Sequence, residues 1–168
     1  MNFEYRLFVP KQAVGANLVY FDLFNNHDES LILKYVEPVV SGAVAVTGVV
    51  GLDLILTFTS AVGTGGTAAT RNGTDATACT FARNNPVGPD VPTTITARLT
   101  PTGGATAAGV LAWASLFSEE TNDATYTNKY LLSGQSVIIP KGYGIRVIQG
   151  AVASVGNIGF NVGFSLTK

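Results

Sequence analysis

The side chains that could hold a metal ion gather at one turn of this chain. The only histidine, His27, is followed directly by Asp28 and Glu29 in the run NNHDES. Carboxylate oxygens suit a hard cation, but three neighbours on one turn need further oxygen ligands from elsewhere in the fold. A zinc site built on histidines is excluded, because the chain has a single His and a single Cys. We therefore interpret the turn as solvated and expect no bound metal.

Nucleophilic catalysis lacks the groups that it requires. A Ser-His-Asp triad would have to use His27, and no serine lies in a Gly-x-Ser-x-Gly turn. The single cysteine, Cys79, has no base or cation among its neighbours in residues 77–81, so nothing nearby would activate its thiol. One cysteine also cannot form a disulfide within the chain. We expect Cys79 to be a small buried apolar residue.

The remaining candidates for catalysis are carboxylates and a glycine-rich loop. Glu119, Glu120 and Asp123 are close in sequence, whereas the two carboxylates of a glycosidase face each other across a cleft, about 5 to 9.5 Å apart. The glycines of residues 63–66 are followed by neither a lysine nor a predicted helix, unlike those of a phosphate-binding loop. The sequence thus predicts a protein that is not an enzyme and needs no cofactor.

The elements that must position these groups are β-strands. In the last strand, apolar residues alternate with small ones; the apolar ones are Ile158, Phe160, Val162, Phe164 and Leu166. A period of two buries one face of a strand, and no helix can use it. Because the other face is nearly free of large side chains, another chain could approach it closely. We predict an all-β antiparallel sandwich with strands near residues 3–9, 17–24, 31–38, 43–47, 51–59, 76–82, 93–99, 109–117, 129–139, 144–149 and 157–166.

Charge is scarce in this chain. Only 12% of its 168 residues are charged and 46% are hydrophobic, against about 25% charged in typical soluble domains. A lone monomer has trouble covering its surface with so little charge, so we expect copies of the chain or a partner to cover part of it. The net charge of -1 argues against binding nucleic acid. The N-terminus lacks the pattern of a signal peptide.

The length fits one domain, 1–168, in which three stretches stand out. Residues 39–58 are long enough to span a bilayer, but their three glycines, one carboxylate and many β-branched residues favour two strands over a membrane span. Residues 60–92 are dominated by Gly, Thr, Ala and Asn, and we predict a long surface excursion with at most one strand, near Phe81. Residues 1–9 form a possible arm.

Two parts of the sequence resemble a known family. The first is YFDLFNNHDESLILKYVEPVV with the later loop TSAVGTGGTAATRNGTDATA, and the second is YLLSGQSVIIPKGYGIRVIQG with the final strand. Together they resemble the small jelly-roll proteins on the exterior of tailed bacteriophages, the head decoration or cement proteins and related knobs. The second part is also similar to trimeric jelly rolls of the tumour-necrosis-factor type. The resemblance implies a jelly-roll sandwich whose homotrimers bind the capsid exterior.

The leading hypothesis is therefore a virion protein that is made in the host cytoplasm and stabilises or decorates the capsid surface. Its partners would be further copies of itself and the phage major capsid protein, with no nucleic acid and no membrane. The candidate capsid contacts lie in the N-terminal run: Phe3, Tyr5, Arg6 and Phe8. The alternative for this run is an edge strand that packs on its own domain.

Two other functions stay open. Jelly rolls also serve as lectins, and a carbohydrate-binding or receptor-binding module would use exposed aromatic rings flanked by amides and carboxylates. The best such set is Asp123, Tyr126, Asn128 and Tyr130. The third option is a major capsid protein of a small virus, against which the chain is short and lacks a basic N-terminal arm for packaging a genome.

Overall fold

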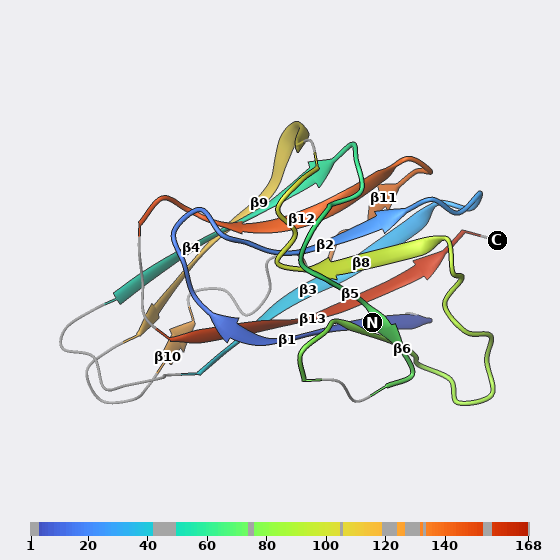
Figure 1. Ribbon diagram of the computed structural model, residues 1–168, viewed down its shortest axis with the longest axis horizontal. Helices are drawn as coiled ribbons and strands as arrows, with labels where there is room; N and C mark the ends of the chain where they lie inside the picture. The colour runs from blue at the N-terminus through green and yellow to red at the C-terminus, as the bar shows by residue number, and fades with distance from the viewer. Residues whose placement is uncertain are drawn as a thin grey trace.

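The chain forms two stacked β-sheets whose strands run along the long axis of the molecule (Figure 1). The computed structural model describes residues 4–41, 50–73, 76–104, 106–118, 124–126, 132, 134–152 and 156–167. Within these ranges all the regular secondary structure is β-strand, and no helix is present. The predicted all-β sandwich of antiparallel sheets is confirmed.

Sheet A contains six strands in the order β11 (Val137–Ile139), β3 (Leu31–Ser41), β13 (Asn157–Leu166), β1 (Tyr5–Ala13), β7 (Thr80–Arg83) and β6 (Thr70–Arg71). Sheet B contains seven strands in the order β10 (Ala124–Tyr126), β9 (Thr106–Ser118), β4 (Val50–Thr59), β12 (Tyr143–Gln149), β2 (Val19–Asn25), β8 (Ile95–Leu99) and β5 (Thr67–Ala68). Neighbouring strands are antiparallel, apart from the parallel pair β6 and β7.

The period-two pattern of the sequence places the core between the sheets. The buried alternating residues include Ile158, Phe160, Val162 and Phe164 of β13 and Leu52, Leu54 and Leu56 of β4. The Phe160 ring lies 5.6 Å from that of Tyr20 and 5.3 Å from that of Phe21, both on β2 of the opposite sheet. Burying one large apolar side chain contributes about 1.5–3 kcal/mol. Contact between the sheets therefore holds the sandwich together.

Two of the predicted strands lie partly or wholly outside the described residues. In the described part of the strand predicted over 129–139, the structure has β11 and an isolated antiparallel bridge between Leu132 and Val36; residues 129–131 and 133 lie outside the described part. The strand predicted over 43–47 also lies outside it. The other long strands form within a few residues of their predicted bounds.

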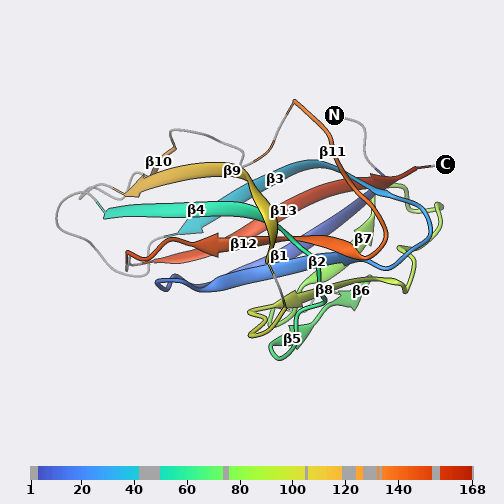
Figure 2. The same ribbon diagram turned by 90° about the horizontal axis from the view of Figure 1, so that it is seen from above.

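Residues 60–92 link the two sheets along one side of the sandwich (Figure 2). β5 pairs with β8 at the edge of sheet B, and β7 pairs with β1 in sheet A. The predicted strand near Phe81 is confirmed as β7. The expectation of at most one strand is wrong, because β5 and β6 also form. Each has two residues, too few to show any alternation in the sequence.

The apolar stretch 39–58 contains the end of β3 and most of β4, while residues 42–49 lie outside the described part. β3 belongs to sheet A and β4 to sheet B. In the part of the chain that the structure describes, no helix has both the length and the apolar character needed to cross a bilayer.

Candidate binding surfaces

The outer face of sheet B carries a buried ion pair. Asp22 of β2 lies opposite Arg146 of β12, with side chains only 1% and 5% exposed. The Arg146 Nη2 atom is 3.8 Å from Asp22 Oδ2, and the Gly63 N–H donates to the same oxygen at 2.8 Å. Burial raises the pKa of Asp22 above its ordinary value, because the loss of water outweighs the attraction of these donors.

Two glycine-rich loops cover this ion pair. Arg146 donates to the carbonyl oxygens of Gly103 and Gly104, the latter at 2.8 Å. The loop before β5 comes so close that a Cβ on Gly63 would lie 2.1 Å from Asp22 Oδ2. A solute cannot reach charges that are buried in this way. We interpret the pair as the anchor that holds both loops on sheet B.

The outer face of sheet A is built around the small residues of β13. Part of the space above them is filled by the chain itself. A Cβ on Gly163 would lie 2.1 Å from a ring carbon of Tyr35, and a Cβ on Gly159 would lie 2.6 Å from the carbonyl oxygen of Val9. These two glycines therefore accommodate β3 and β1 of the same sheet, whereas the sequence alone had pointed to room for another chain.

An apolar strip beside these glycines stays uncovered. It consists of Phe8, Pro10 and Val39. Phe8 is 40% exposed on β1. Phe8, Pro10 and Val39 also line a shallow groove of about 260 Å³. We take this apolar strip as the candidate assembly surface.

The three described members of the predicted capsid-contact set, Tyr5, Arg6 and Phe8, differ in exposure. β1 lies inside sheet A, between β13 and β7, so residues 5–9 are neither a free arm nor an edge strand. Tyr5 is buried and Arg6 is half-buried, whereas Phe8 points outward. Phe3 lies outside the described residues. Among the described members of the set, Phe8 is therefore the one that a partner could contact as a large apolar side chain.

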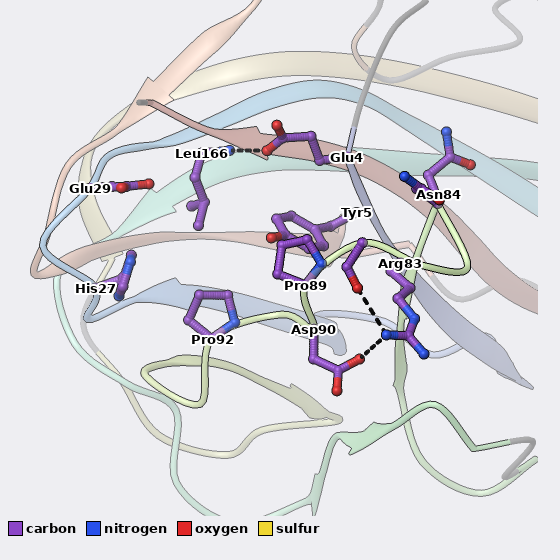
Figure 3. Close-up of a pocket in the computed structure, with 12 residues that line it drawn as sticks. Glu4, Tyr5, His27, Glu29, Arg83, Asn84, Pro89, Asp90, Pro92 and Leu166 are labelled. Atoms are coloured by element: carbon purple, nitrogen blue, oxygen red, sulfur yellow. Dashed lines mark hydrogen bonds and ion pairs between the residues drawn. The ribbon is translucent and has the colours of Figure 1, made fainter.

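A pocket of about 540 Å³ opens at the end of the sandwich where β1 begins and β13 ends (Figure 3). Its apolar walls are Leu166, Pro89 and Pro92. Tyr5 is its most deeply buried lining residue, only 5% exposed. The Tyr5 ring packs against Phe164 with centroids 5.6 Å apart, which fixes the direction of its hydroxyl group. Among the described residues, none forms a hydrogen bond with this hydroxyl.

The rim of this end pocket is acidic. Burial raises the pKa of Tyr5, and the negative charges of Glu4, Glu29 and Asp90 raise it further. Asp90 forms an ion pair with Arg83 at 3.4 Å. Within the described ranges, the carboxylates of Glu4 and Glu29 have no cationic partner. The pocket thus combines a lone hydroxyl with an excess of negative charge.

The three side chains of the turn considered as a metal site, His27, Asp28 and Glu29, have different surroundings in the structure. His27 and Glu29 line the end pocket. Asp28 instead accepts a hydrogen bond from Lys141 Nζ at 2.6 Å, and this contact holds its pKa below the usual range. His27 Nδ1 lies 3.0 Å from Thr94 Oγ1. Over the ranges that the structure describes, no three His, Cys, Asp or Glu side chains could hold a metal ion together.

The predicted glycan set cannot be assembled from the described residues. Tyr126 ends β10, and only its backbone is described. Asp123, Asn128 and Tyr130 lie outside the described part of the chain. The carbohydrate hypothesis therefore stays a prediction.

Cys79 is a buried core residue, as predicted. Burial raises the pKa of its thiol to about 12, and the charge of Asp22 contributes to the rise. Nucleophilic chemistry by a thiolate is therefore excluded at this position near neutral pH.

The sequence interpretation missed the end pocket. Its lining comes from the start of β1, the turn after β2, the segment that follows β7 and the end of β13. In the sequence, Tyr5 and Leu166 belong to the alternating pattern of strands, and Pro89 and Pro92 belong to a loop. No local sequence motif therefore marks the pocket. The one available signal was the polar turn at His27.

No protein-family model, no curated protein and no solved structure matches this chain. Its function must therefore be argued from the fold and from these surfaces.

Proposed function

We propose that this chain is a jelly-roll protein of a virion surface, which binds a capsid as a homotrimer and carries out no catalysis. The observation that carries the proposal is the pairing order of its eight principal strands. In chain order these are β1, β2, β3, β4, β9, β11, β12 and β13.

A jelly roll is a long hairpin of eight strands that is rolled into two sheets. Its first strand pairs with the eighth, the second with the seventh, the third with the sixth and the fourth with the fifth. The corresponding pairs in this chain are β1 with β13, β2 with β12, β3 with β11 and β4 with β9, all antiparallel. This agreement supports the jelly-roll assignment and, through it, the resemblance to phage surface proteins.

The two outer faces support self-association through sheet A. Loops of the same chain already cover the ion pair of Asp22 and Arg146 on sheet B. The apolar strip on sheet A is left for other molecules to cover. Covering exposed apolar area contributes about 25 cal/mol per Å², and the low charge of the whole chain leaves few groups to oppose it.

The mechanism would be avidity. Once one protomer of an oligomer has bound the shell, the other copies are held near their sites at an effective concentration that can reach the millimolar range. The overall affinity of the oligomer can then exceed that of a single protomer by a factor of about 10² to 10⁴, although each contact by itself is weak. Such binding requires no active site.

Light scattering of the purified chain and of Phe8→Glu tests the proposal. We expect the parent to have three times the chain mass, and the variant to shift toward the monomer because a buried carboxylate at the interface would lose its water. Val110→Glu is the matched control, since Val110 is 48% exposed on β9 of sheet B. This control should leave the oligomer intact.

Co-sedimentation with virus heads that lack the protein gives the second readout. The parent should pellet with the heads, and Phe8→Glu should remain largely in the supernatant. A parent chain that is monomeric at micromolar concentration and ignores the heads would refute the proposal. Deleting residues 1–9 is not a clean test, because it removes most of the interior strand β1.

A further inference from the structure

We infer that the end pocket binds a primary ammonium group on an aliphatic chain, as in a lysine side chain or a free polyamine. The inference concerns the end of the sandwich and does not rest on the proposed oligomer or on capsid binding. It rests on three features that come from different segments of the chain (Figure 3). Among the described residues, the Tyr5 hydroxyl has no hydrogen-bond partner and two carboxylates have no cationic partner. The third feature is the apolar wall of the pocket.

The Tyr5 hydroxyl belongs to the most deeply buried residue that lines the pocket. The side chain is 95% buried, since 5% of it is exposed, and no described residue hydrogen-bonds to its oxygen. The oxygen itself is not sealed from solvent, so a ligand in the pocket can reach it and supply a hydrogen-bond partner. The oxygen has lone pairs that can accept a hydrogen bond from an N–H group.

The charge of the pocket selects the kind of donor. Glu4, Glu29 and Asp90 line the pocket together with Tyr5, and after burial their negative charges contribute to the raised pKa of its hydroxyl. Asp90 is neutralised in part by Arg83 at 3.4 Å, whereas Glu4 and Glu29 have no cationic partner among the described residues. An ammonium group offers three donors and one positive charge, and so satisfies both needs.

The walls of the pocket select what carries the ammonium group. Leu166, Pro89 and Pro92 contribute apolar surface to the lining of the pocket. Methylene groups of an aliphatic stem can pack against such surface while the charged head remains polar on all sides. A sugar ring fits less well, because the Tyr5 ring packs against Phe164 and offers almost no exposed face for stacking.

Titration of the ¹⁵N-labelled full chain with 1,5-diaminopentane at low ionic strength tests the inference. Amide shifts of Glu4, Tyr5 and residues 88–92 should move and saturate. 1,5-Pentanediol has the same chain and two hydroxyl ends without charge, and it should cause no saturable shift. Added salt should weaken the binding of the diamine, because the carboxylates on the rim are exposed to solvent.

Two variants test the groups by themselves. Tyr5→Phe removes the hydroxyl oxygen and keeps the packed ring. It should lower the affinity for the diamine about tenfold, as expected for a lost hydrogen bond to a charged group. Glu29→Gln removes one negative charge from the rim and should lower the affinity for the diamine about threefold. The matched controls are Tyr143→Phe and Asp53→Asn, which change the same groups outside the pocket and should leave the affinity unchanged.

A comparison of ligands separates the two sources of the ammonium group. A peptide with one lysine and a blocked N-terminus should bind more tightly than the diamine if the natural ligand is a protein side chain, and less tightly if it is a free polyamine. The inference is overturned if the diol binds as well as the diamine. It is also overturned if the diamine causes no saturable shift, or if its affinity is the same in Tyr5→Phe, Glu29→Gln and the parent.

Discussion

Sheet B carries an outward-facing ion pair that loops of the same chain cover, whereas part of the outward face of sheet A, around Phe8, is left open. On sheet B, Asp22 and Arg146 lie beneath loops that they themselves hold through hydrogen bonds. On sheet A, the apolar strip around Phe8 has no such cover within the described residues. The first face is closed by the chain's own loops, and the second is available to other molecules.

The difference shows what a buried charge contributes in a protein with few charges. Two charges that leave water cost several kcal/mol each, so their mutual attraction adds little net stability. What the pair supplies is position: the loops before β5 and before β9 each have one polar partner on the sheet. An apolar face fixes no loop in this way and remains adaptable.

The largest effect is expected from Arg146→Leu. This change leaves Asp22 buried without its cationic partner and removes the donor to Gly104, so the free energy of unfolding should fall by about 3–5 kcal/mol. Urea denaturation measures it. Lys141→Met removes a cation from the exposed pair with Asp28 and should have little effect. Equal losses in the two variants would show that burial of the pair does not matter.

A smaller effect is expected from Gly63→Ala on sheet B. The new methyl group would lie 2.1 Å from Asp22 Oδ2 and 2.6 Å from Pro101 Cβ, and both neighbours are held in place. We expect a loss of about 1–3 kcal/mol in thermal or urea unfolding, as for other overpacked sites.

Gly163→Ala on sheet A gives the comparison for that variant. Its methyl group would lie 2.1 Å from a ring carbon of Tyr35, a half-buried side chain that is less confined than the buried Asp22. We expect a loss below about 1 kcal/mol, smaller than that of Gly63→Ala. The reverse order would show that the face of sheet A is the more rigid of the two.

The smallest effect expected is on how the free energy of unfolding depends on pH. Asp22 and Asp28 should contribute to this dependence with opposite signs. Burial raises the pKa of Asp22 in the folded state, so its contribution to stability is full below the ordinary value of 3.8 and is lost as the pH rises through the raised value. Lys141 lowers the pKa of Asp28, so that contribution is present above 3.8 and is lost as the pH falls through the lowered value.

Urea unfolding of Asp22→Asn and Asp28→Asn over the acid range measures the two dependences. The stability of the parent relative to Asp22→Asn should decrease with rising pH. Its stability relative to Asp28→Asn should increase. Parallel slopes would contradict the assignment of opposite environments to the two side chains.

Much of the fold could be predicted from residues that are neighbours in sequence. The alternation of Ile158, Phe160, Val162 and Phe164 predicted β13 with its bounds and its buried face. The position of β1 inside sheet A was not predicted, because an edge strand and an interior strand carry the same alternation. As a result, Tyr5 was expected on a contact surface and instead lines a pocket.

The sequence by itself determined that the chain makes strands, which faces of the long strands are apolar and that charge is scarce. These properties depend on local periodicity and on composition, which any fold of the chain must keep. The tertiary structure alone decided that Asp22 meets Arg146 and that Tyr5 comes to lie between Glu4, Glu29 and Asp90. Such meetings depend on which strands pair and in which register, and the free energy that selects a pairing is spread over the whole core.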